Sequence, residues 1–139
     1  MIKFVKSEMM KINVYEEQKC FLSNKNRMEE AIKRDDVLTF DIYNDTELVG
    51  FAMLQQFKKD SFFLWNYAIY YKYQNKGLGV NALNELINLL KEKYNMKIMT
   101  TTYTYGNWVA KKLYEKIGFV QTDIVCNDEC HEVNMIYKV

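Results

Sequence analysis

The sequence predicts a mixed α/β fold, with one mixed and mostly antiparallel sheet that carries helices on both faces. Three observations predict it. A meander of strand-forming runs fills the middle of the chain. Two segments with helical spacing of apolar residues then alternate with strands, and a hairpin closes the sequence. The 139 residues have the length of one domain and contain no repeat or linker, so we expect a single domain over residues 1–139.

The first third predicts a short strand followed by two helices. Residues 2–5 have the composition of a strand. Ser7 can accept a hydrogen bond from an amide of a first helical turn, so a helix is expected to begin there. Asn26, with Glu29 three residues on, has the pattern of a capping box, and apolar residues recur at helical spacing from there to Arg34.

The middle of the chain predicts three strands. The runs 38–43 and 47–57 are rich in strand formers and are separated by Asn44-Asp45, which suits the turn of a hairpin. Gly50 inside the second run indicates a bulge. The run 61–70 is continuously aromatic and apolar, which is typical of a central strand that is covered on both faces.

The second half alternates helices with strands. Apolar residues follow helical spacing over 77–94, and a strand is expected over 97–103. The next helix, 107–118, begins at an asparagine cap and ends at a glycine that suits a left-handed stop. Two more strands, 119–126 and 132–139, close the chain around a polar turn.

Composition and charge exclude several classes of function. The chain is 49% apolar and 15% aromatic, so it is expected to form a packed core. Lys and Arg number 19 against 18 Asp and Glu, so the bulk basicity of a nucleic-acid-binding protein is absent. No apolar stretch is long enough to span a bilayer, and no export signal opens the chain. We therefore expect a cytoplasmic protein with no membrane and no nucleic-acid partner.

The cysteines favour free thiols over a disulfide framework or a metal site. There are three, Cys20, Cys126 and Cys130, which is an odd number in a chain without an export signal. Cys126, Cys130 and His131 could act as metal ligands only with distant Cys20 as the fourth, and paired Cys-x-x-Cys motifs are missing. We expect no metal. His131 is the single histidine, and no nucleophile motif of a hydrolase accompanies it.

The glycine-containing segment 74–79 joins the apolar central strand to the helix 77–94. Unpaired amides at a helix start, the positive end of the helix dipole and two glycines together suit a pyrophosphate. Residues 72–116 hold eight Lys against three Glu, a local balance of +5 that would attract a polyanion. A tight turn with solvated lysines is the alternative interpretation. From Gly77 the chain also matches Gly-x-Gly-x-x-Ala, the dinucleotide-binding fingerprint. The acidic residue that such a site needs about twenty positions on is missing, because Thr100, Thr101 and Thr102 occupy that place.

Two motifs of the second half resemble one known family. Gln74-x-x-Gly77-x-Gly79 follows an apolar strand, and about thirty residues later the chain reads Asn107-x-x-Ala110-x-x-Leu113-Tyr114-Glu115-Lys116-Ile117-Gly118-Phe119. In this order and separation, they resemble the acetyl-CoA-binding core of the GNAT N-acetyltransferases. Within that superfamily, the segments 47–53 and 72–79 are similar to the bacterial spermine/spermidine acetyltransferases.

The resemblance implies acetyl-CoA as cosubstrate and direct transfer to an amine, with no covalent enzyme intermediate. It also implies a sheet that splays after the central strand to admit the pantetheine arm. Main-chain groups of Ala68 and Ile69 would pair with that arm, and Asn107 would contact it. Tyr114 would protonate the departing thiolate, although it also suits the buried face of a helix. The pyrophosphate would be held by the backbone amides of Gln74, Asn75, Lys76, Gly77, Leu78 and Gly79.

Recognition of the acceptor amine and removal of its proton each leave more than one candidate in the sequence. Residues 27–47 have a charge balance of −4, which suits either an acidic wall for a polycation such as spermine or spermidine or a solvated surface. No carboxylate lies in the segment 64–69 of the central strand, so the base stays open, and Asn66 or a tyrosine hydroxyl could order a water for this role. The residues that could line a slot for an aliphatic amine, or instead belong to the core, are Tyr15, Trp65, Tyr67 and Tyr70.

Two other functions stay open. The first is acetylation of another amine, such as an amino acid, an aminoglycoside or a protein N-terminus. The second is a non-catalytic CoA-binding sensor or interaction module. The final strand, 132–139, could pair or swap at a sheet edge, which would form a homodimer.

Overall fold

A computed structural model describes all 139 residues, and its strands form one seven-stranded sheet. The strands are β1 (Ile2–Lys6), β2 (Val37–Asn44), β3 (Glu47–Lys58), β4 (Ser61–Ile69), β5 (Ile98–Thr104), β6 (Val120–Cys126) and β7 (His131–Lys138). They lie in the order β1-β2-β3-β4-β5-β7-β6. All neighbours are antiparallel except β4 and β5, which confirms a mixed and mostly antiparallel sheet.

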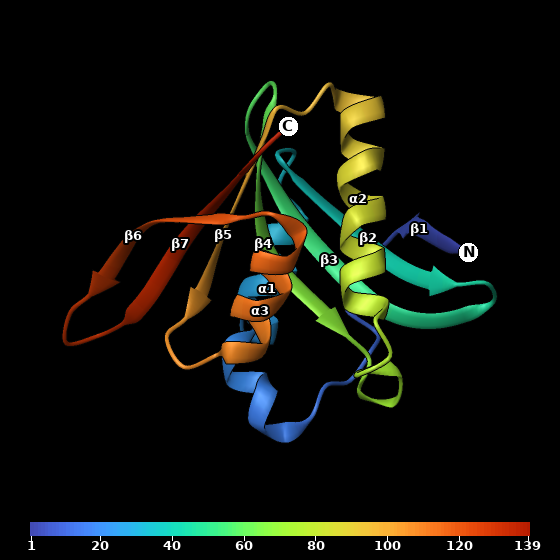
Figure 1. Cartoon of the computed structure of the whole chain (residues 1–139). Coiled ribbons are helices and arrows are strands. Elements are labelled where there is room, and N and C mark those ends of the chain that lie inside the picture. The colour runs from blue at the N-terminus through green and yellow to red at the C-terminus, as the bar shows by residue number, and fades with distance from the viewer.

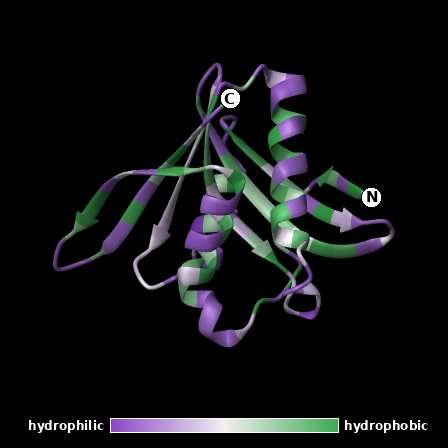
Figure 2. Cartoon of the chain, viewed as in Figure 1, coloured by the Kyte–Doolittle hydropathy of each residue, from purple (hydrophilic) through white to green (hydrophobic).

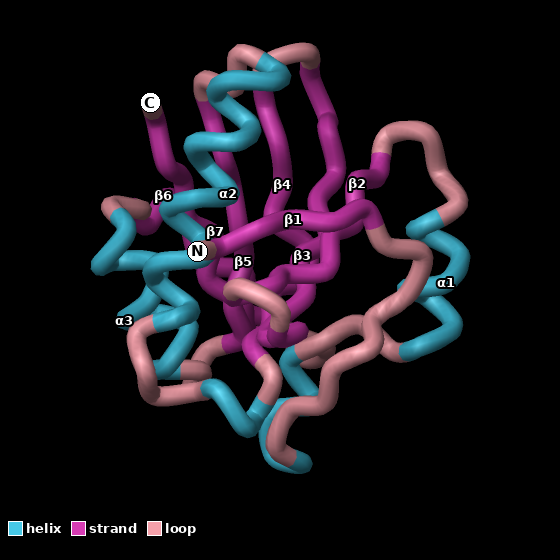
Figure 3. The backbone as a smooth tube through the Cα atoms, turned by 90° about the vertical axis from the view of Figure 1, so that its right-hand side faces the viewer, coloured by secondary structure: helices cyan, strands magenta, loops and turns pink.

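Helices cover both faces of this sheet, as predicted (Figure 1). The helices are α1 (Lys25–Ile32), α2 (Leu78–Tyr94) and α3 (Trp108–Ile117), with two 3₁₀ turns, η1 (Glu16–Phe21) and η2 (Tyr71–Tyr73). The view turned by 90° shows α1 on one side of the sheet and α2 on the other (Figure 3). None of the helices combines the length and the apolar character needed to cross a bilayer.

Each face of the sheet has its own apolar core. The larger core joins the inner stripe of α2, with Leu83, Leu86 and Leu90 fully buried, to strands β3, β4, β5 and β7. Apolar and polar residues alternate along α2, as the amphipathic repeat requires (Figure 2). The smaller core packs α1 and the segment before it, including Met28 and Ile12, against the opposite face of β3 and β4.

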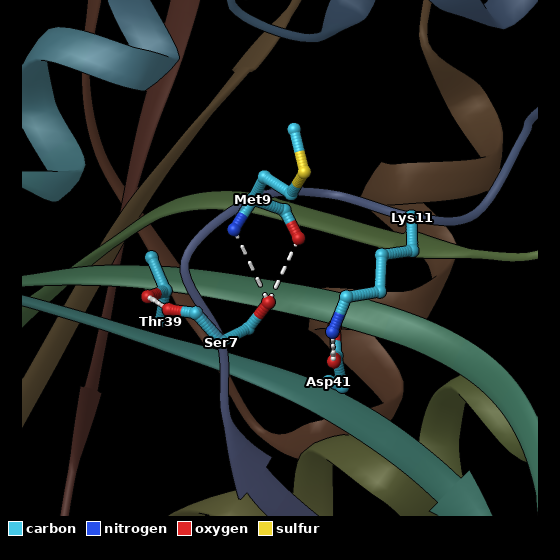
Figure 4. A network of polar contacts seen from close by, with 5 residues as sticks. All are labelled: Ser7, Met9, Lys11, Thr39 and Asp41. Carbon is cyan, nitrogen blue, oxygen red and sulfur yellow. Dashed lines mark hydrogen bonds and ion pairs between the residues drawn. The ribbon is translucent and has the colours of Figure 1, made fainter.

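The helix expected from Ser7 is wrong, because the chain stays extended there. The Ser7 N–H donates to the Thr39 carbonyl at 3.0 Å, and the Ser7 carbonyl accepts the Thr39 hydroxyl, so pairing with β2 continues past β1. The Ser7 hydroxyl does meet an amide, that of Met9, at 3.3 Å, but this bond closes a local turn (Figure 4). Lys11 then reaches back to the buried carboxylate of Asp41, 2.6 Å away. Hydrogen bonding to β2 therefore outweighs the local preference for a helix start at Ser7.

The capping box at Asn26 is also wrong, although the helix itself is present. Asn24 is the cap, and its side chain accepts the Arg27 N–H at 2.9 Å. The helix ends at Ile32. Two asparagines stand two residues apart in one polar run, so the local pattern supports either start.

The bulge expected at Gly50 is confirmed. The register of β2 against β3 shifts between Ile42 and Tyr43, which leaves Val49 as the extra residue. A Cβ at position 50 would lie 2.8 Å from the Ala68 carbonyl oxygen, so only glycine lets β3 approach β4 this closely. The left-handed helix stop is also confirmed, because Gly118 has a φ of 118°.

The final strand is not at an edge of the sheet. The order β5-β7-β6 places β7 between two partners and β6 outside, because the closing hairpin folds back beyond β7. The expectation that residues 132–139 offer a free edge is therefore wrong, and the homodimer stays a prediction. The edge strand β6 is solvent-exposed along all seven residues.

Candidate functional site

The central strand β4 separates from β5 halfway along its length. Their parallel pairing covers only Ser61 to Leu64 against Ile98 to Thr101, although both strands continue beyond it. At the same point the register of β3 against β4 shifts, because Trp65 is an extra residue in β4. A bulge bends its strand and ends regular pairing. The sheet is therefore splayed between β4 and β5, as predicted.

The bulge at Trp65 also changes which side chains face which core. Before it, Phe62 and Leu64 belong to the core under α2, whereas after it Ala68 belongs to the core under α1. Tyr67 consequently points to the α2 side, where its hydroxyl donates to the Gly79 carbonyl at 2.6 Å. Burial, with a smaller contribution from nearby Tyr114, raises the pKa of the Tyr67 phenol, so it stays a neutral donor.

The turn after β4 presents a row of unpaired amides. Asn75 and Gly77 both have positive φ, at 63° and 79°, and α2 begins directly after Gly77. The first helical hydrogen bond runs from the Asn81 N–H to the Gly77 carbonyl at 3.1 Å. The amides of residues 75–80 precede it, and none donates within the chain, whereas the Gln74 amide, also expected among the pyrophosphate donors, donates to the Tyr71 carbonyl at 3.4 Å. Consecutive free amides with alternating backbone handedness, at the positive end of a helix, form a concave site for an anion.

A single cavity of about 760 Å³ connects this turn with the gap between β4 and β5. Eight of the ten site residues predicted from the sequence line it: Ala68, Ile69, Gln74, Asn75, Gly77, Gly79, Asn107 and Tyr114. The side chains of Lys76 and Leu78 do not. Both faces of the sheet contribute lining residues, because Val14 and Leu22 belong to the core on the α1 side and Leu113 and Tyr114 to the core on the α2 side. The cavity therefore passes through the splayed sheet.

Tyr114 lies on the α3 wall of the cavity and is only 7% exposed. Its ring packs against Phe119, with ring centroids 5.3 Å apart. Burial raises the pKa of the Tyr114 phenol, so the hydroxyl is protonated at neutral pH and can act as a donor. Asn107 begins the same helix, and its Oδ1 accepts the Ala110 N–H at 3.3 Å.

Two carboxylates that no sequence pattern indicates line the cavity. Glu17 comes from η1 and Glu132 from the start of β7. They are its only charged side chains, and no Lys, Arg or His lines it. The composition of residues 27–47 could not indicate them, because both lie outside that range and reach the cavity only through folding.

Of the two interpretations of the acidic residues in 27–47, the structure does not support an acidic wall at the cavity, because none of their seven carboxylates lines it. Asp36 binds Arg34 at 2.6 Å and Asp41 binds Lys11. Asp45 pairs with the N-terminal amine, and Glu47 accepts the Tyr73 hydroxyl. Of the expected aromatic slot, Trp65 and Tyr67 line the cavity, whereas Tyr15 and Tyr70 pack against Tyr71.

Hydrogen bonds fix the wall that faces the α1 side. Asn66 accepts the Ser23 N–H at 2.9 Å and donates to the Ser23 hydroxyl at 3.1 Å, so its amide is occupied in holding the loop before α1. Gln18 and Gln74 donate to each other's carbonyl oxygens at 2.9 and 2.8 Å. Gln74 also donates to the Ile69 carbonyl at 2.9 Å, at the end of β4. These contacts join η1 to the amide-rich turn.

None of the cysteines lines this cavity, and the histidine does not line it either. All three cysteines are free thiols. His131 stacks on Tyr105 with ring centroids 4.1 Å apart and planes within 5° of parallel. The structure holds no cluster of three or more His, Cys, Asp or Glu side chains that could bind a metal ion.

Comparison with curated proteins finds relatives among acetyltransferases. The chain is 35% identical over 85 residues to the spermine/spermidine N(1)-acetyltransferase of Bacillus subtilis, covering 56% of each protein. It is 36% identical over 87 residues to the [ribosomal protein bS18]-alanine N-acetyltransferase of Haemophilus influenzae, covering 63% of this chain and 58% of that protein. The chain thus aligns with little more than half the length of these relatives.

Solved structures with the same fold and a family comparison also point to acetyltransferases. A GNAT family acetyltransferase from Elizabethkingia anophelis with acetyl-CoA bound superimposes with a TM-score of 0.77 at 18% identity, over 99% of this chain and 98% of that one. Spermidine N-acetyltransferase from Vibrio cholerae, in complex with CoA and spermine, gives a TM-score of 0.68 at 18% identity, over 84% and 76%. Residues 4–119 match the acetyltransferase (GNAT) family, and because this match spans most of the chain, the protein belongs to that family.

Proposed function

We propose that the protein is an acetyl-CoA-dependent N-acetyltransferase that passes the acetyl group directly to a primary amine, with a polyamine such as spermine or spermidine as the acceptor. One observation carries the proposal: a continuous cavity leads from the free amides of residues 75–80, through the gap between β4 and β5, to the buried phenol of Tyr114. Bound acetyl-CoA would supply the acetyl group as an activated thioester.

The cofactor end of the cavity is suited to a polyanion with an extended arm. Six free amides and the dipole of α2 would hold the pyrophosphate, and the backbone of Lys76 and Leu78 takes part although their side chains point elsewhere. Beyond Leu64, β4 has no strand partner on the β5 side. Main-chain groups around Ala68 and Ile69 are therefore proposed to pair with the arm, as a missing strand would. Asn107 faces the same space from the start of α3.

Tyr114 is the proposed proton donor. In the transfer, a nitrogen–carbon bond forms, the carbon–sulfur bond breaks, the amine loses a proton and the sulfur gains one. A phenol whose pKa is raised by burial stays protonated at neutral pH and can donate to the sulfur as its charge develops. Because Tyr114 shares the cavity with the free amides, one bound molecule can reach both.

The charge of the cavity supports a polycationic acceptor. Glu17 and Glu132 are its only charged side chains, so an ammonium group meets attraction and a carboxylate meets repulsion. Phe63 and Trp65 line it from β4 and offer apolar surface for the methylene groups between ammonium groups. An amino acid would bring a carboxylate that no basic side chain of the cavity could pair.

The experiment is an acceptor panel in which the release of the CoA thiol is followed with a chromogenic disulfide. Cys20 and Cys126 are exposed and would react too, so blanks contain enzyme without acceptor. Spermidine and spermine are compared with an aminoglycoside and an alanine-terminated peptide, and 1,6-diaminohexane with 6-aminohexanoate as a matched pair that differs in its terminal charge. We expect turnover of the polyamines and a preference for the diamine.

Each other outcome contradicts a stated part of the proposal. Turnover of the peptide or the aminoglycoside but not of spermidine or spermine would refute the polyamine acceptor and leave the transferase. Equal rates with 1,6-diaminohexane and 6-aminohexanoate would refute the role of the two carboxylates. Binding of CoA without turnover of any acceptor would favour a non-catalytic CoA-binding module.

A further inference from the structure

Gln18 and Gln74 form a reciprocal amide pair that joins two parts of the cavity wall. Each side chain donates to the other's Oε1, at 2.9 and 2.8 Å. Gln74 opens the turn with the free amides, and Gln18 lies in η1, which carries Glu17 and Phe21 to the acceptor side. We propose that this amide pair is a coupling element: when a cofactor occupies the free amides of residues 75–80, the pair orders η1 and thereby Glu17 on the proposed acceptor side, an inference that rests on the proposed function.

The 3₁₀ turn η1 has little else to hold it. None of its residues is buried. Its salt bridge between Lys19 and Glu16, at 2.8 Å, lies on the surface and within the turn itself. The chain is anchored before η1, where the Tyr71 N–H donates to the Asn13 carbonyl at 2.9 Å, and after it, where Ser23 binds Asn66. Within the turn, Gln18 Oε1 also accepts the Tyr15 N–H at 3.1 Å. Between the two anchors, the only hydrogen bonds from η1 to residues outside 15–22 are those to Gln74.

Gln74 is placed so that an anion on the turn would fix its side chain. Its Nε2 also donates to the Ile69 carbonyl at 2.9 Å, so its amide bridges the end of β4, the turn and η1. The free amides follow directly in sequence, from residue 75 to residue 80. A phosphate held by them restricts the backbone on which Gln74 sits, and the amide pair passes that restriction to Gln18.

The consequence falls on Glu17, which is adjacent to Gln18 in the chain and lines the cavity. An ordered η1 presents this carboxylate in one place, whereas a mobile η1 spreads its positions and weakens attraction for an ammonium group. Coupling of this kind is reciprocal, so the acceptor would in turn tighten the binding of the cofactor. Gln18 is thus a positioning residue that acts through η1 and does not need to touch the reacting atoms.

The test uses CoA alone, so it does not depend on knowing the acceptor. Hydrogen exchange of the full chain is followed by mass spectrometry with and without saturating CoA, in the wild type, in Gln18→Met and in Lys19→Ala. Gln18→Met removes the amide pair and the local bond from the Tyr15 N–H and keeps the side-chain length, so the readout is the change that CoA causes within each variant. Lys19→Ala is the matched control, because it removes the surface salt bridge of η1 and leaves the amide pair intact.

In the wild type, we expect CoA to slow exchange at residues 75–80. It should also slow exchange at residues 16–21 by about five- to tenfold, the factor expected if opening of η1 must then break one or two neutral hydrogen bonds. In Gln18→Met, protection of 75–80 should persist while that of 16–21 disappears. Lys19→Ala should behave as the wild type does on addition of CoA.

The outcomes separate this inference from the proposed function. If CoA protects 75–80 but not 16–21 in the wild type, or protects 16–21 equally in Gln18→Met, the coupling is refuted and the cofactor site stands. Direct shielding of η1 by CoA would give the second of these results. If CoA fails to protect 75–80, the proposed cofactor site is refuted together with the coupling.

Discussion

The substitution Gly79→Asp tests where the cofactor binds, because the structure separates its effect on the fold from its effect on the ligand. A Cβ at position 79 would lie 3.7 Å from Ile69 Cγ1 and 3.8 Å from Leu113 Cδ1, which are ordinary contacts. Gly79 is the second residue of α2, where an acidic side chain favours the helix by about 0.3–1 kcal/mol. The free energy of unfolding should therefore be unchanged or slightly increased.

The same carboxylate would lie beside the proposed pyrophosphate. Two like charges about 4 Å apart repel by about 1 kcal/mol if water screens them and by about 4 kcal/mol at a partly buried surface. The dissociation constant of CoA should therefore rise by roughly five- to a thousandfold. Calorimetry measures it, with Gly79→Asn as the control that adds the same volume without the charge.

Two results would refute this reasoning. Unchanged affinity of Gly79→Asp for CoA would show that the pyrophosphate binds elsewhere. An equal loss in Gly79→Asn and Gly79→Asp would show that volume and not charge is responsible, and the electrostatic part of the argument would fail. A loss for Gly79→Asp that shrinks as salt is added would support the charge, because exposed charges are screened.

Four further predictions follow from the same geometry. Gly77→Ala should destabilise the protein by about 1–2 kcal/mol in denaturant unfolding, because φ there is 79°, whereas Gly77→Asn should cost less; equal costs would contradict the backbone argument. Tyr114→Phe should lower kcat by roughly a hundredfold or more and leave CoA affinity unchanged, since the ring still packs on Phe119; a wild-type rate would exclude it as the donor. Burial raises the pKa values of Tyr67 and Tyr114, so their neutral forms stabilise the fold at neutral pH and this stability is lost as pH rises above about 10; urea midpoints that increase from pH 9 to 11 would contradict the assignment. Glu17→Gln should raise KM more for 1,6-diaminohexane than for hexylamine, and equal changes would remove Glu17 from acceptor recognition.

Elements with a strong local signal could be predicted from the sequence. The helix α2 repeats Leu83, Leu86 and Leu90 on one face, and all three are fully buried under the sheet. The stop at Gly118 and the bulge beside Gly50 depend on backbone geometry that few other residues adopt, so one residue suffices to indicate each. The turn of residues 74–79 was predictable for the same reason, because its glycines and the following helix are local in sequence.

The N-terminal segment could not be predicted, because distant partners decide its conformation. Ser7 has the side chain of a helix cap, and locally nothing opposes a helix. Two bonds to Thr39, more than thirty positions away, keep the backbone extended, and Lys11 adds an ion pair with buried Asp41. The two carboxylates of the cavity could not be predicted for a related reason: Glu17 and Glu132 lie near opposite ends of the sequence, and only the folded chain brings both to the cavity lining.

The bulge at Trp65 was the least predictable feature, yet the site depends on it. Nothing in a continuous apolar run indicates which residue will be left without a partner. With strict alternation, Tyr67 would share a face with Phe63 and point away from α2, and β4 could continue to pair with β5. One unpaired residue instead ends that pairing and turns Tyr67 toward the Gly79 carbonyl. The gap that admits a ligand and the hydrogen bond that braces the amide-rich turn therefore have the same cause.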